Sequence, residues 1–371
     1  MTTFTNKATL PRLYLYGVNN MVTVNKPKYY DSSRVLSKQY NLNMIIGPRG
    51  YGKTYGYKKY CINKAINGEG KFIYMRRKKS EIDAITDFFG DLRNDPKFVK
   101  QNIVFDKRGY ELFFAYDDDR DENDRHNWNH IGTLFPLSTE ATMKSREFPE
   151  YENLIFDEWL PLTAGEFLRN EPKKFASALD TVFRLREFNV FCIGNSSILF
   201  NPYFEYFNIY PNLAKEFTNN TERSILIQVI SSEEWAETRT NSPLGRLING
   251  TEYADYANEN QFTDDDDSLV EDKPAKAKNI MVFKLEGYTV GVWRDFDNGM
   301  VYFSEQYNET IPDKYAFDFE EIDAEYQPYR NLFDSPNINI LKVARQRGKI
   351  RFTSKKAKAH SRAITSRIHL L

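Results

Sequence analysis

An α/β fold built on a parallel sheet is predicted for residues 1–233, and three observations predict it. Short apolar runs of the kind that form buried strands alternate with segments of helical periodicity. The first run, "LNMIIG" (42–47), leads into a glycine-rich loop and then a helix-like segment. A later run, "LIFDEW" (154–159), ends in two carboxylates. With 371 residues, 41% of them hydrophobic, the chain is long enough for two or three packed domains.

The expected elements follow from apolar periodicity and from helix start and stop signals. The helix after the glycine loop should stop at Asn67-Gly68, and Ser80 should be the N-cap of the next helix. "NIVFDKRGYELFFAY" (102–116) has the pattern of a hairpin, and "KKFASALDTVFRLREF" (173–188) that of an amphipathic helix. The other expected strands are 42–47, 71–77, 130–138, 152–159, 189–197 and 223–231, and the other expected helices are 53–66 and 80–92.

The composition changes after Ser232, and this change sets the expected domain boundaries. Residues 1–233 form the first domain with an N-terminal arm, residues 234–274 a linker, and residues 275–371 a second domain. "EEWAETRT" (233–240) should be a short helix, whereas "TDDDDSLVEDKPAKAK" (263–278) is charged and poor in apolar residues. Beyond it, alternating residues predict antiparallel strands with a turn at Asp297-Asn298-Gly299.

The net charge of −1 hides a strong asymmetry. The segment from Leu341 to the end contains ten Lys and Arg and no Asp or Glu, so the rest of the chain carries −11. A basic end on an acidic body favours a polyanionic partner such as nucleic acid, and a solvated, flexible tail is the alternative.

Several other classes of site have little support in the sequence. Cys61 and Cys192 lie far apart in apolar segments, so buried thiols are expected rather than a disulfide or a metal site. His126 and His130 are four residues apart, but the acidic, loop-like segment around them does not predict a zinc site. No apolar run reaches the length of about 18–20 residues that spans a bilayer, so we expect an intracellular protein without a membrane partner.

The loop "GPRGYGKT" (47–54) fits the phosphate-binding pattern G-x-x-x-x-G-K-[ST] at every fixed position. Its glycines (Gly47, Gly50 and Gly52) allow backbone N–H groups to converge on phosphate oxygens, and the following helix adds its positive N-terminal dipole. Lys53 should reach the β- and γ-phosphates, and the Thr54 hydroxyl should bind Mg²⁺. The cofactors implied are ATP and Mg²⁺. The alternative is an ordinary glycine turn before a helix.

Asp157 and Glu158 follow an apolar strand about a hundred residues beyond this loop. Asp157 at the strand end is placed to hold Mg²⁺ through water, and Glu158 to orient and deprotonate the attacking water. An adjacent Asp-Glu pair on a surface is the alternative, but its position after a buried strand favours catalysis.

Other polar side chains have two open interpretations. Asn195 ends the strand "VFCIGNSS" and either approaches the γ-phosphate or belongs to a strand-end turn. Arg184 and Arg186, on the expected helix, either act on a neighbouring subunit's γ-phosphate or are exposed helix charges. Charge density alone favours nucleic-acid contact for two clusters, although a solvated strand end is possible for the first. The clusters are Arg76, Arg77, Lys78 and Lys79, and Lys355, Lys356 and Lys358.

The sequence resembles the DNA-packaging ATPases of small short-tailed phages with protein-primed genomes, the Picovirinae type. Several unrelated strings agree in order over most of residues 35–262, and "GYTVGVW" agrees more loosely in the C-terminal part. The strings are the phosphate loop, "FIYMRRKK", "FPEYENLIFDEW", "LDTVFRLRE", "CIGNSS", "NPYFEYFN" and "GRLINGTEY".

The resemblance implies an α/β P-loop NTPase of the additional-strand catalytic-glutamate (ASCE) class, followed by a small linker and an α+β domain. That domain looks like a vestigial ribonuclease-H-like nuclease that binds DNA or a packaging RNA. The resemblance also implies a homomeric ring, usually a pentamer, at the portal of an empty procapsid in the infected bacterial cytoplasm. The ring would drive double-stranded DNA into the procapsid and be absent from the mature virion.

The resemblance also assigns residues. Arg49 matches an arginine within the phosphate loop of terminase-like motors, and Arg184 matches the arginine proposed to act in trans. Lys144 matches a lysine proposed to assist it, and Lys79 one that faces the DNA channel. Asp157 and Glu158 match the magnesium and catalytic acids.

Two rival functions remain open on the sequence. A terminase-like nuclease with an auxiliary ATPase would need several converging carboxylates, for which Glu286, Asp295, Asp297 and Glu305 are the candidates. We expect no active nuclease, because the Asp-Asn-Gly turn already explains Asp297. A nucleotide-switched scaffold would bind ATP and nucleic acid with slow turnover. The residues that contact adenine are not identified, and stacking on Tyr29 or Tyr30 is one option.

Overall fold

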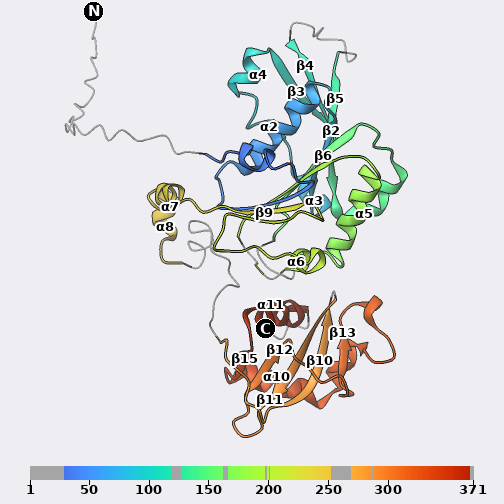
Figure 1. Cartoon of the computed structure of the whole chain (residues 1–371), viewed down its shortest axis with the longest axis vertical. Helices are drawn as coiled ribbons and strands as arrows, with labels where there is room; N and C mark the ends of the chain where they lie inside the picture. Colours follow the sequence, from blue (N-terminus) through green and yellow to red (C-terminus); the bar gives the residue numbers. More distant parts are fainter. Residues whose placement is uncertain are drawn as a thin grey trace, which may run out of the picture.

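The computed structural model describes residues 29–117, 127–161, 166–196, 199, 201–251, 269–285 and 287–367. Within these residues the chain forms a nine-stranded sheet followed by a six-stranded sheet, each with its own hydrophobic core (Figure 1). The N-terminal arm, His126, Glu286 and residues 252–268 of the expected linker lie outside the described residues.

The larger sheet is parallel in its centre and antiparallel at both edges. Six neighbouring strands, from β5 to β9, run parallel, while β3 and β4 form a hairpin on one edge and β8 pairs antiparallel on the other. Strand β7 lies between β1 and β6. The expected parallel sheet and hairpin are therefore confirmed. In spatial order the strands are β3 (Ile103–Arg108), β4 (Glu111–Tyr116), β5 (Asn129–Pro136), β2 (Lys71–Arg76), β6 (Tyr151–Asp157), β7 (Asn189–Gly194), β1 (Leu42–Ile46), β9 (Ile225–Val229) and β8 (Phe217–Asn220).

Helices cover both faces of this sheet. On one face, α2 buries Tyr57, Cys61 and Ile62 against the central strands. On the other, α5 and α6 pack around Phe156 and Trp159. Strands covered on both faces are mainly apolar, which explains the run Met44–Ile46 in β1. The helices are α1 (Ser33–Leu36), α2 (Lys53–Ile66), α3 (Lys79–Asp83), α4 (Pro96–Lys100), α5 (Glu171–Phe183), α6 (Pro202–Phe207) and the 3₁₀ segment η2 (Leu137–Ser145).

Several helix boundaries differ from expectation. The helix expected over residues 80–92 ends at Asp83, and turns and bends follow it. Ser80 is not an N-cap, because α3 begins one residue earlier and the Lys78 N–H donates to the Glu81 carboxylate at 2.7 Å. Helix α5 ends at Phe183, so Arg184 and Arg186 lie beyond it rather than on it. The chain leaves the helix at Arg184, where φ is 52° and ψ is −112°.

The segment that we expected to be a linker contains two short helices in its described part. α7 (Glu233–Thr240) is the predicted helix, and the Ser232 side chain caps it by accepting from the Trp235 N–H at 3.2 Å. α8 (Pro243–Ile248) follows and is capped in the same way by Ser242. Both helices lie beside the larger sheet in Figure 1.

The C-terminal domain is a mixed sheet with two helices. Strands β10, β11 and β12 are antiparallel neighbours, β13 and β14 extend the sheet from β10 in parallel, and β15 pairs parallel with β12. The basic end of the chain is part of this domain and not a flexible tail, because α11 contributes Ile364 to its core. The elements are β10 (Lys278–Leu285), β11 (Tyr288–Arg294), β12 (Val301–Ser304), β13 (Lys314–Ala316), η4 (Phe319–Glu321), β14 (Gln327–Pro328), η5 (Tyr329–Asp334), α10 (Pro336–Gln346), β15 (Ile350–Phe352) and α11 (Lys355–Arg367).

Charged contacts join the two domains where α6 faces α11 (Figure 1). The Glu205 carboxylate lies 2.9 Å from Lys356 Nζ and 3.2 Å from His360 Nε2. Burial raises the pKa of Glu205, but its contacts with His360, Tyr210 and Lys356 outweigh this and hold the pKa at about 2. Glu205 is therefore ionised at any ordinary pH, and its attraction to α11 persists.

The two cysteines are buried free thiols, as expected, and burial raises the pKa of each above its usual value. Within the described part of the chain, no helix combines the length and the apolar character that a membrane crossing requires.

Candidate nucleotide-binding site

The phosphate loop lies where the chain leaves β1 and enters α2, at the carboxyl edge of the parallel sheet. Gly50 and Gly52 adopt φ values of 77° and 93°, which glycine reaches without the steric cost of a Cβ atom. Together with the ends of β6 and β7, the loop surrounds a cavity of about 260 Å³. The side chains around this cavity include Lys53, Thr54, Asp157, Glu158 and Asn195, so the structure brings these five sequence-predicted residues together.

The Lys53 ammonium group is folded back onto its own loop. It donates to the Gly47 and Pro48 carbonyls at 2.8 and 2.7 Å and to Asn195 Oδ1 at 3.2 Å. Burial lowers the pKa of Lys53 to about 7, and the Asp157 carboxylate opposes this shift only in part. An ammonium group held this way needs an anion, and a polyphosphate in the loop would supply one.

Because the pKa of Lys53 is low, nucleotide binding should take up a proton at alkaline pH. A phosphate beside the amine restores its charge, so ADP binding should take up most of a proton per site at pH 8 and much less at pH 6. Titration calorimetry in buffers of different ionisation enthalpy, without magnesium, measures this uptake. Equal uptake at both pH values would contradict the assignment to Lys53.

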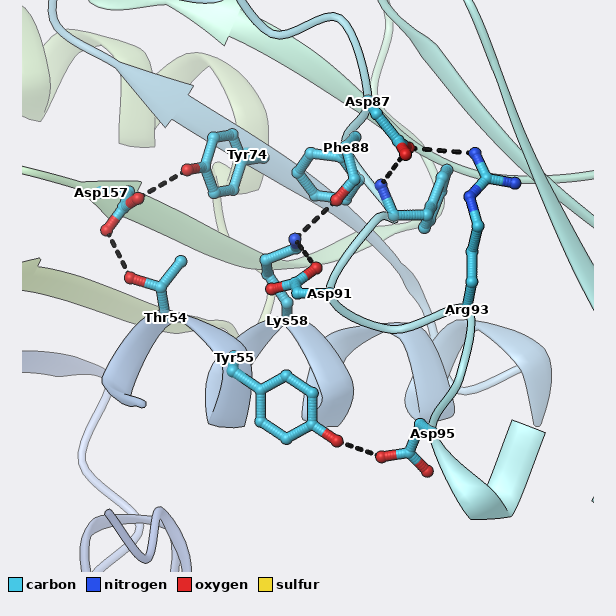
Figure 2. A network of polar contacts seen from close by, with 11 residues as sticks. Thr54, Tyr55, Lys58, Tyr74, Asp87, Phe88, Asp91, Arg93, Asp95 and Asp157 are labelled. Carbon is cyan, nitrogen blue, oxygen red and sulfur yellow. Dashed lines mark hydrogen bonds and ion pairs between the residues drawn. The ribbon is translucent and has the colours of Figure 1, made fainter. Parts of the chain in front are cut away.

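Thr54 and Asp157 provide the oxygen donors expected for Mg²⁺. The Thr54 hydroxyl donates to Asp157 Oδ1 at 2.8 Å, and the Tyr74 hydroxyl donates to Asp157 Oδ2 at 2.6 Å (Figure 2). Burial, followed by the charge of Asp157, raises the pKa of Tyr74, so Tyr74 remains a donor and fixes the carboxylate. A hydroxyl and a carboxylate fit the preference of Mg²⁺ for hard oxygen ligands.

Side chains in the first two turns of α2 bind the helix to a neighbouring segment of the chain. Lys58 donates to Asp91 at 2.6 Å and to the Phe88 carbonyl at 2.6 Å, and Tyr55 donates to Asp95 (Figure 2). These bonds fix α2 to the segment between α3 and α4, so the phosphate loop starts from a rigid element.

Glu158 adopts a backbone conformation that non-glycine residues rarely adopt. Its φ is 54°, and its side chain is 54% exposed at the rim of the cavity. The Arg76 guanidinium lies 2.5 Å from Glu158 Oε2 and 3.6 Å from Asp157 Oδ2. Arg76 therefore pairs with the catalytic candidate itself, which the sequence analysis did not anticipate.

Removal of Arg76 should release Glu158. A carboxylate oxygen that is held by a guanidinium is not free to orient the attacking water, so Arg76→Ala should raise DNA-free ATP turnover several-fold and reduce its stimulation by DNA. Steady-state hydrolysis with and without linear duplex DNA measures both. Arg34→Ala, which breaks an exposed Arg34–Glu216 pair, is the matched control. A lower DNA-free rate in Arg76→Ala alone would show that the pair supports Glu158 instead of restraining it.

Arg49 is an exposed residue of the same loop and lines the cavity. Its carbonyl accepts from Arg239 of α7 at 3.2 Å. The ring centre of Trp235, which is also in α7, lies 5.2 Å from the ring centre of Tyr51 and 5.7 Å from that of Tyr29. Tyr51 and Trp235 were not predicted from the sequence, because only the fold brings α7 to the phosphate loop.

Arg184 and Lys144 lie away from this cavity. Arg184 is exposed in the turn before the amino end of β7, whereas the cavity lies at the carboxyl end. Lys144 is 62% exposed on η2, which packs against α5, and its ammonium lies 3.7 Å from Glu140. Arg186 binds the Phe148 carbonyl at 2.6 Å and so joins the Arg184 turn to the segment after η2.

The basic run after β2 divides into two pairs. Arg76 and Arg77 turn inward, and Arg77 is buried against Glu171, whereas Lys78 and Lys79 are exposed. The second basic cluster is similarly mixed. In α11, Lys358 is buried, Lys356 contacts Glu205 across the domain boundary, and Lys355 is half-buried.

The three described carboxylates that were candidates for a nuclease site lie next to cations. Asp297 pairs with Lys276, whose ammonium also lies 3.8 Å from the buried Asp295. Glu305 lies 3.6 Å from Lys356. Among the described residues, no group of three or more His, Cys, Asp or Glu side chains is arranged to hold a metal ion.

Comparison with known proteins agrees with this geometry. Residues 24–368 match the family model of the podovirus DNA encapsidation protein (Gp16). The chain is 29% identical over 331 residues to the DNA packaging protein of Bacillus phage phi29, covering 89% of this chain and 94% of that protein. It is 30% identical over 320 residues to the DNA packaging protein of Bacillus phage B103, covering 86% and 94%.

The fold is also similar to a solved structure. A chain of the bacteriophage Phi-29 viral genome packaging motor assembly superposes with a TM-score of 0.65 at 25% identity, covering 92% of this chain and 99% of that one. Both the sequence match and the structural match span nearly the full length of the chain. The protein therefore belongs to the family of podovirus DNA encapsidation proteins.

Proposed function

We propose that this chain is the ATP-driven subunit of a motor that moves double-stranded viral DNA into a procapsid. The observation that carries the proposal is the cavity that joins the phosphate loop to Asp157 and Glu158 in a DNA encapsidation protein. The DNA packaging proteins of phi29 and B103 support the same function.

The topology favours the ASCE class of P-loop ATPases. Strand β7 lies between β1, which leads into the phosphate loop, and β6, which ends at Asp157. This inserted strand is the additional strand after which the class is named, and Glu158 takes the place of its catalytic glutamate. Asn195, at the end of β7, lies between these two strands at the cavity and is placed to sense the γ-phosphate.

The residues around the cavity have different roles in ATP hydrolysis. Lys53 and the loop N–H groups hold the β- and γ-phosphates, and Thr54 with Asp157 would hold Mg²⁺, which supplies positive charge to the phosphates. Glu158 orients the attacking water and accepts its proton once Arg76 no longer pairs with it.

A homomeric ring would complete this site with Arg184 from a neighbouring subunit. Within one subunit, β7 separates the Arg184 turn from the cavity, and its six residues span roughly 20 Å. An arginine side chain does not bridge that length, so Arg184 serves a subunit other than its own. The exposed Lys144 would assist it from η2. We expect a pentamer docked on the procapsid portal.

The DNA would be gripped through its phosphates. Lys78 and Lys79 are exposed beside Arg76, so a phosphate drawn to them would compete with Glu158 for Arg76. Recognition of this kind is independent of sequence and weakens with salt. In the C-terminal cluster, Lys355 and Lys356 remain candidates for contact with DNA or a packaging RNA, whereas the burial of Lys358 leaves it unsuited to that role.

The C-terminal domain fits a ribonuclease-H-like core. Three antiparallel strands extended by parallel strands on the side of the first strand, in the order β12-β11-β10-β13-β14, support this assignment. We propose that the domain binds nucleic acid and does not cleave it. Mg²⁺- or Mn²⁺-dependent cutting of DNA that is lost in Asp295→Ala would favour the nuclease alternative instead.

The proposal is tested by protection of DNA from nuclease in the presence of procapsids and ATP. The wild-type protein should protect the viral DNA, and Lys53→Ala should not. If ATP is hydrolysed but no DNA is protected, the chain is not a complete motor. ATP and DNA binding with negligible turnover, even with procapsids, would instead favour a nucleotide-switched scaffold.

A further inference from the structure

A buried ionic network lies directly behind the catalytic turn. The Arg77 guanidinium donates to the Glu158 carbonyl at 3.1 Å, to the Trp159 carbonyl, and to Glu171 Oε2 at 2.8 Å. The other Glu171 oxygen accepts from the Tyr203 hydroxyl at 2.9 Å. This network thus connects the residue after β6 with the first turn of α5 and with α6.

The network is almost completely removed from solvent. The side chains of Arg77 and Glu171 are 5% and 0% exposed, and Tyr203 is fully buried. A buried ion pair costs desolvation energy that an apolar pair of the same volume avoids, so it is weak evidence for a role in stability. Its hydrogen bonds nevertheless fix geometry, because Arg77 presents its donors in a rigid planar fork.

That geometry acts on Glu158, the proposed catalytic base. Glu158 adopts a left-handed backbone conformation, which costs a non-glycine residue about 1 kcal/mol or more. Arg77 holds the carbonyls of Glu158 and Trp159, which belong to the two peptide groups after Glu158, and the Trp159 N–H donates to the Ile193 carbonyl at 3.3 Å. The turn is therefore fixed from β2 on one side and from β7 on the other.

The same network lies next to the surface on which the C-terminal domain rests. Lys173, two residues after Glu171, lies 3.4 Å from Glu320. Glu205, two residues after Tyr203, contacts Lys356 of α11. A shift of the C-terminal domain would therefore act on α5 and α6 within one helical turn of their network residues.

We infer that Arg77, with Glu171 and Tyr203, is the positioning group for the catalytic glutamate and connects its turn to the C-terminal domain. Arg77 touches neither nucleotide nor DNA in this role and acts only through Glu158. The inference rests on the proposed hydrolytic role of Glu158.

The test uses a variant that loses the fork without leaving a lone buried charge. In Arg77→Met/Glu171→Gln both charges of the buried pair are removed. In the native protein Glu171 accepts hydrogen bonds from the Tyr203 hydroxyl and, at 2.7 Å, from the Leu168 N–H, and the glutamine side chain can still bond to both groups. Arg77→Lys keeps the charge but loses the planar fork, and it decides the test if the double variant does not fold. Arg351→Met is the matched control, because Arg351 also binds two backbone carbonyls and a glutamate, but in the C-terminal domain.

The expected result is a kcat at least about 10-fold below wild type with the dissociation constant of a fluorescent ATP analogue within about 2-fold. In single-turnover reactions, the same change should cause no further loss in the Glu158→Gln background, because residues that act as a unit are not additive. Hydrogen exchange of the amides at 158–160 should accelerate in the Arg77 variants and not in Arg351→Met.

Three results would overturn the inference: an unchanged kcat in the folded variant, an equal loss in the Glu158→Gln background, or unchanged exchange at 158–160. The exchange measurement does not depend on activity, so it separates failure of this inference from failure of the proposed motor function.

Discussion

Glu158→Gln should lower ATP turnover by about 10²–10⁴-fold while ATP still binds with nearly wild-type affinity. Glutamine keeps the size of the side chain and its hydrogen bond to Arg76, but it does not accept a proton from water. Lys53, Thr54 and Asp157, which we propose hold the nucleotide and Mg²⁺, are unchanged. The loss should therefore appear in kcat and not in binding.

Steady-state hydrolysis with linear duplex DNA and the affinity for a fluorescent ATP analogue measure these two quantities. Glu222→Gln, in the exposed turn before β9, is the matched control and should behave as wild type. If Glu158→Gln hydrolyses ATP at the wild-type rate, another base activates the water, and the interpretation of "FDEW" fails. If it no longer binds ATP, Glu158 is needed for the shape of the site.

The sheet and the phosphate loop were predictable because their signals are local. A strand that is covered on both faces is mainly apolar, and β1 and β6 each contain three consecutive buried apolar residues, Met44–Ile46 and Leu154–Phe156. A phosphate cradle needs glycines at fixed spacing, and Gly50 and Gly52 do adopt the positive φ values that only glycine reaches easily. In such segments, neighbouring residues alone determine the structure.

The run "RRKK" (76–79) is a segment whose structure depends on residues that are distant in the sequence. Charge density predicted one DNA-binding cluster, but Arg76 and Arg77 turn inward to Glu158 and Glu171. Part of this was accessible from the sequence: Tyr74 and Arg76 are two residues apart, so they share a face of β2 and both reach Asp157. The partner of Arg77 was not accessible, because Glu171 is 94 residues away and nothing nearby marks it as buried.

The alternative prediction of a flexible basic tail at the C-terminus was wrong for a similar reason. Ten cations without an acid predict repulsion and solvation within the segment, but its neutralising partners lie elsewhere in the chain. Glu205 of the first domain contacts Lys356, and Glu271 contacts Arg351. Net charge read along the sequence does not reveal ion pairs between segments that fold together.

Arg184→Ala should abolish ATP hydrolysis by the ring, with a loss of about 10³–10⁵-fold in kcat, and leave ATP binding to the subunit intact. Arg184 is exposed in a sparsely populated backbone conformation at the end of α5, and the adjacent Leu185 is fully exposed. Strain of this kind is concentrated at functional sites, and here it occurs at an exposed arginine. Arg223→Ala, another exposed arginine that binds a backbone carbonyl, is the control.

Mixing two inactive variants distinguishes action in trans from action in cis. In a ring of Arg184→Ala and Glu158→Gln subunits, an Arg184→Ala subunit retains Glu158 and can receive Arg184 from a Glu158→Gln neighbour. At equal ratio, about a quarter of the interfaces then contain both groups, because ring interfaces are head-to-tail. ATP hydrolysis should therefore return in part, in proportion to these mixed interfaces. If Arg184 acts within its own subunit, no interface is restored at any ratio, and the turn at the end of α5 has a structural role only.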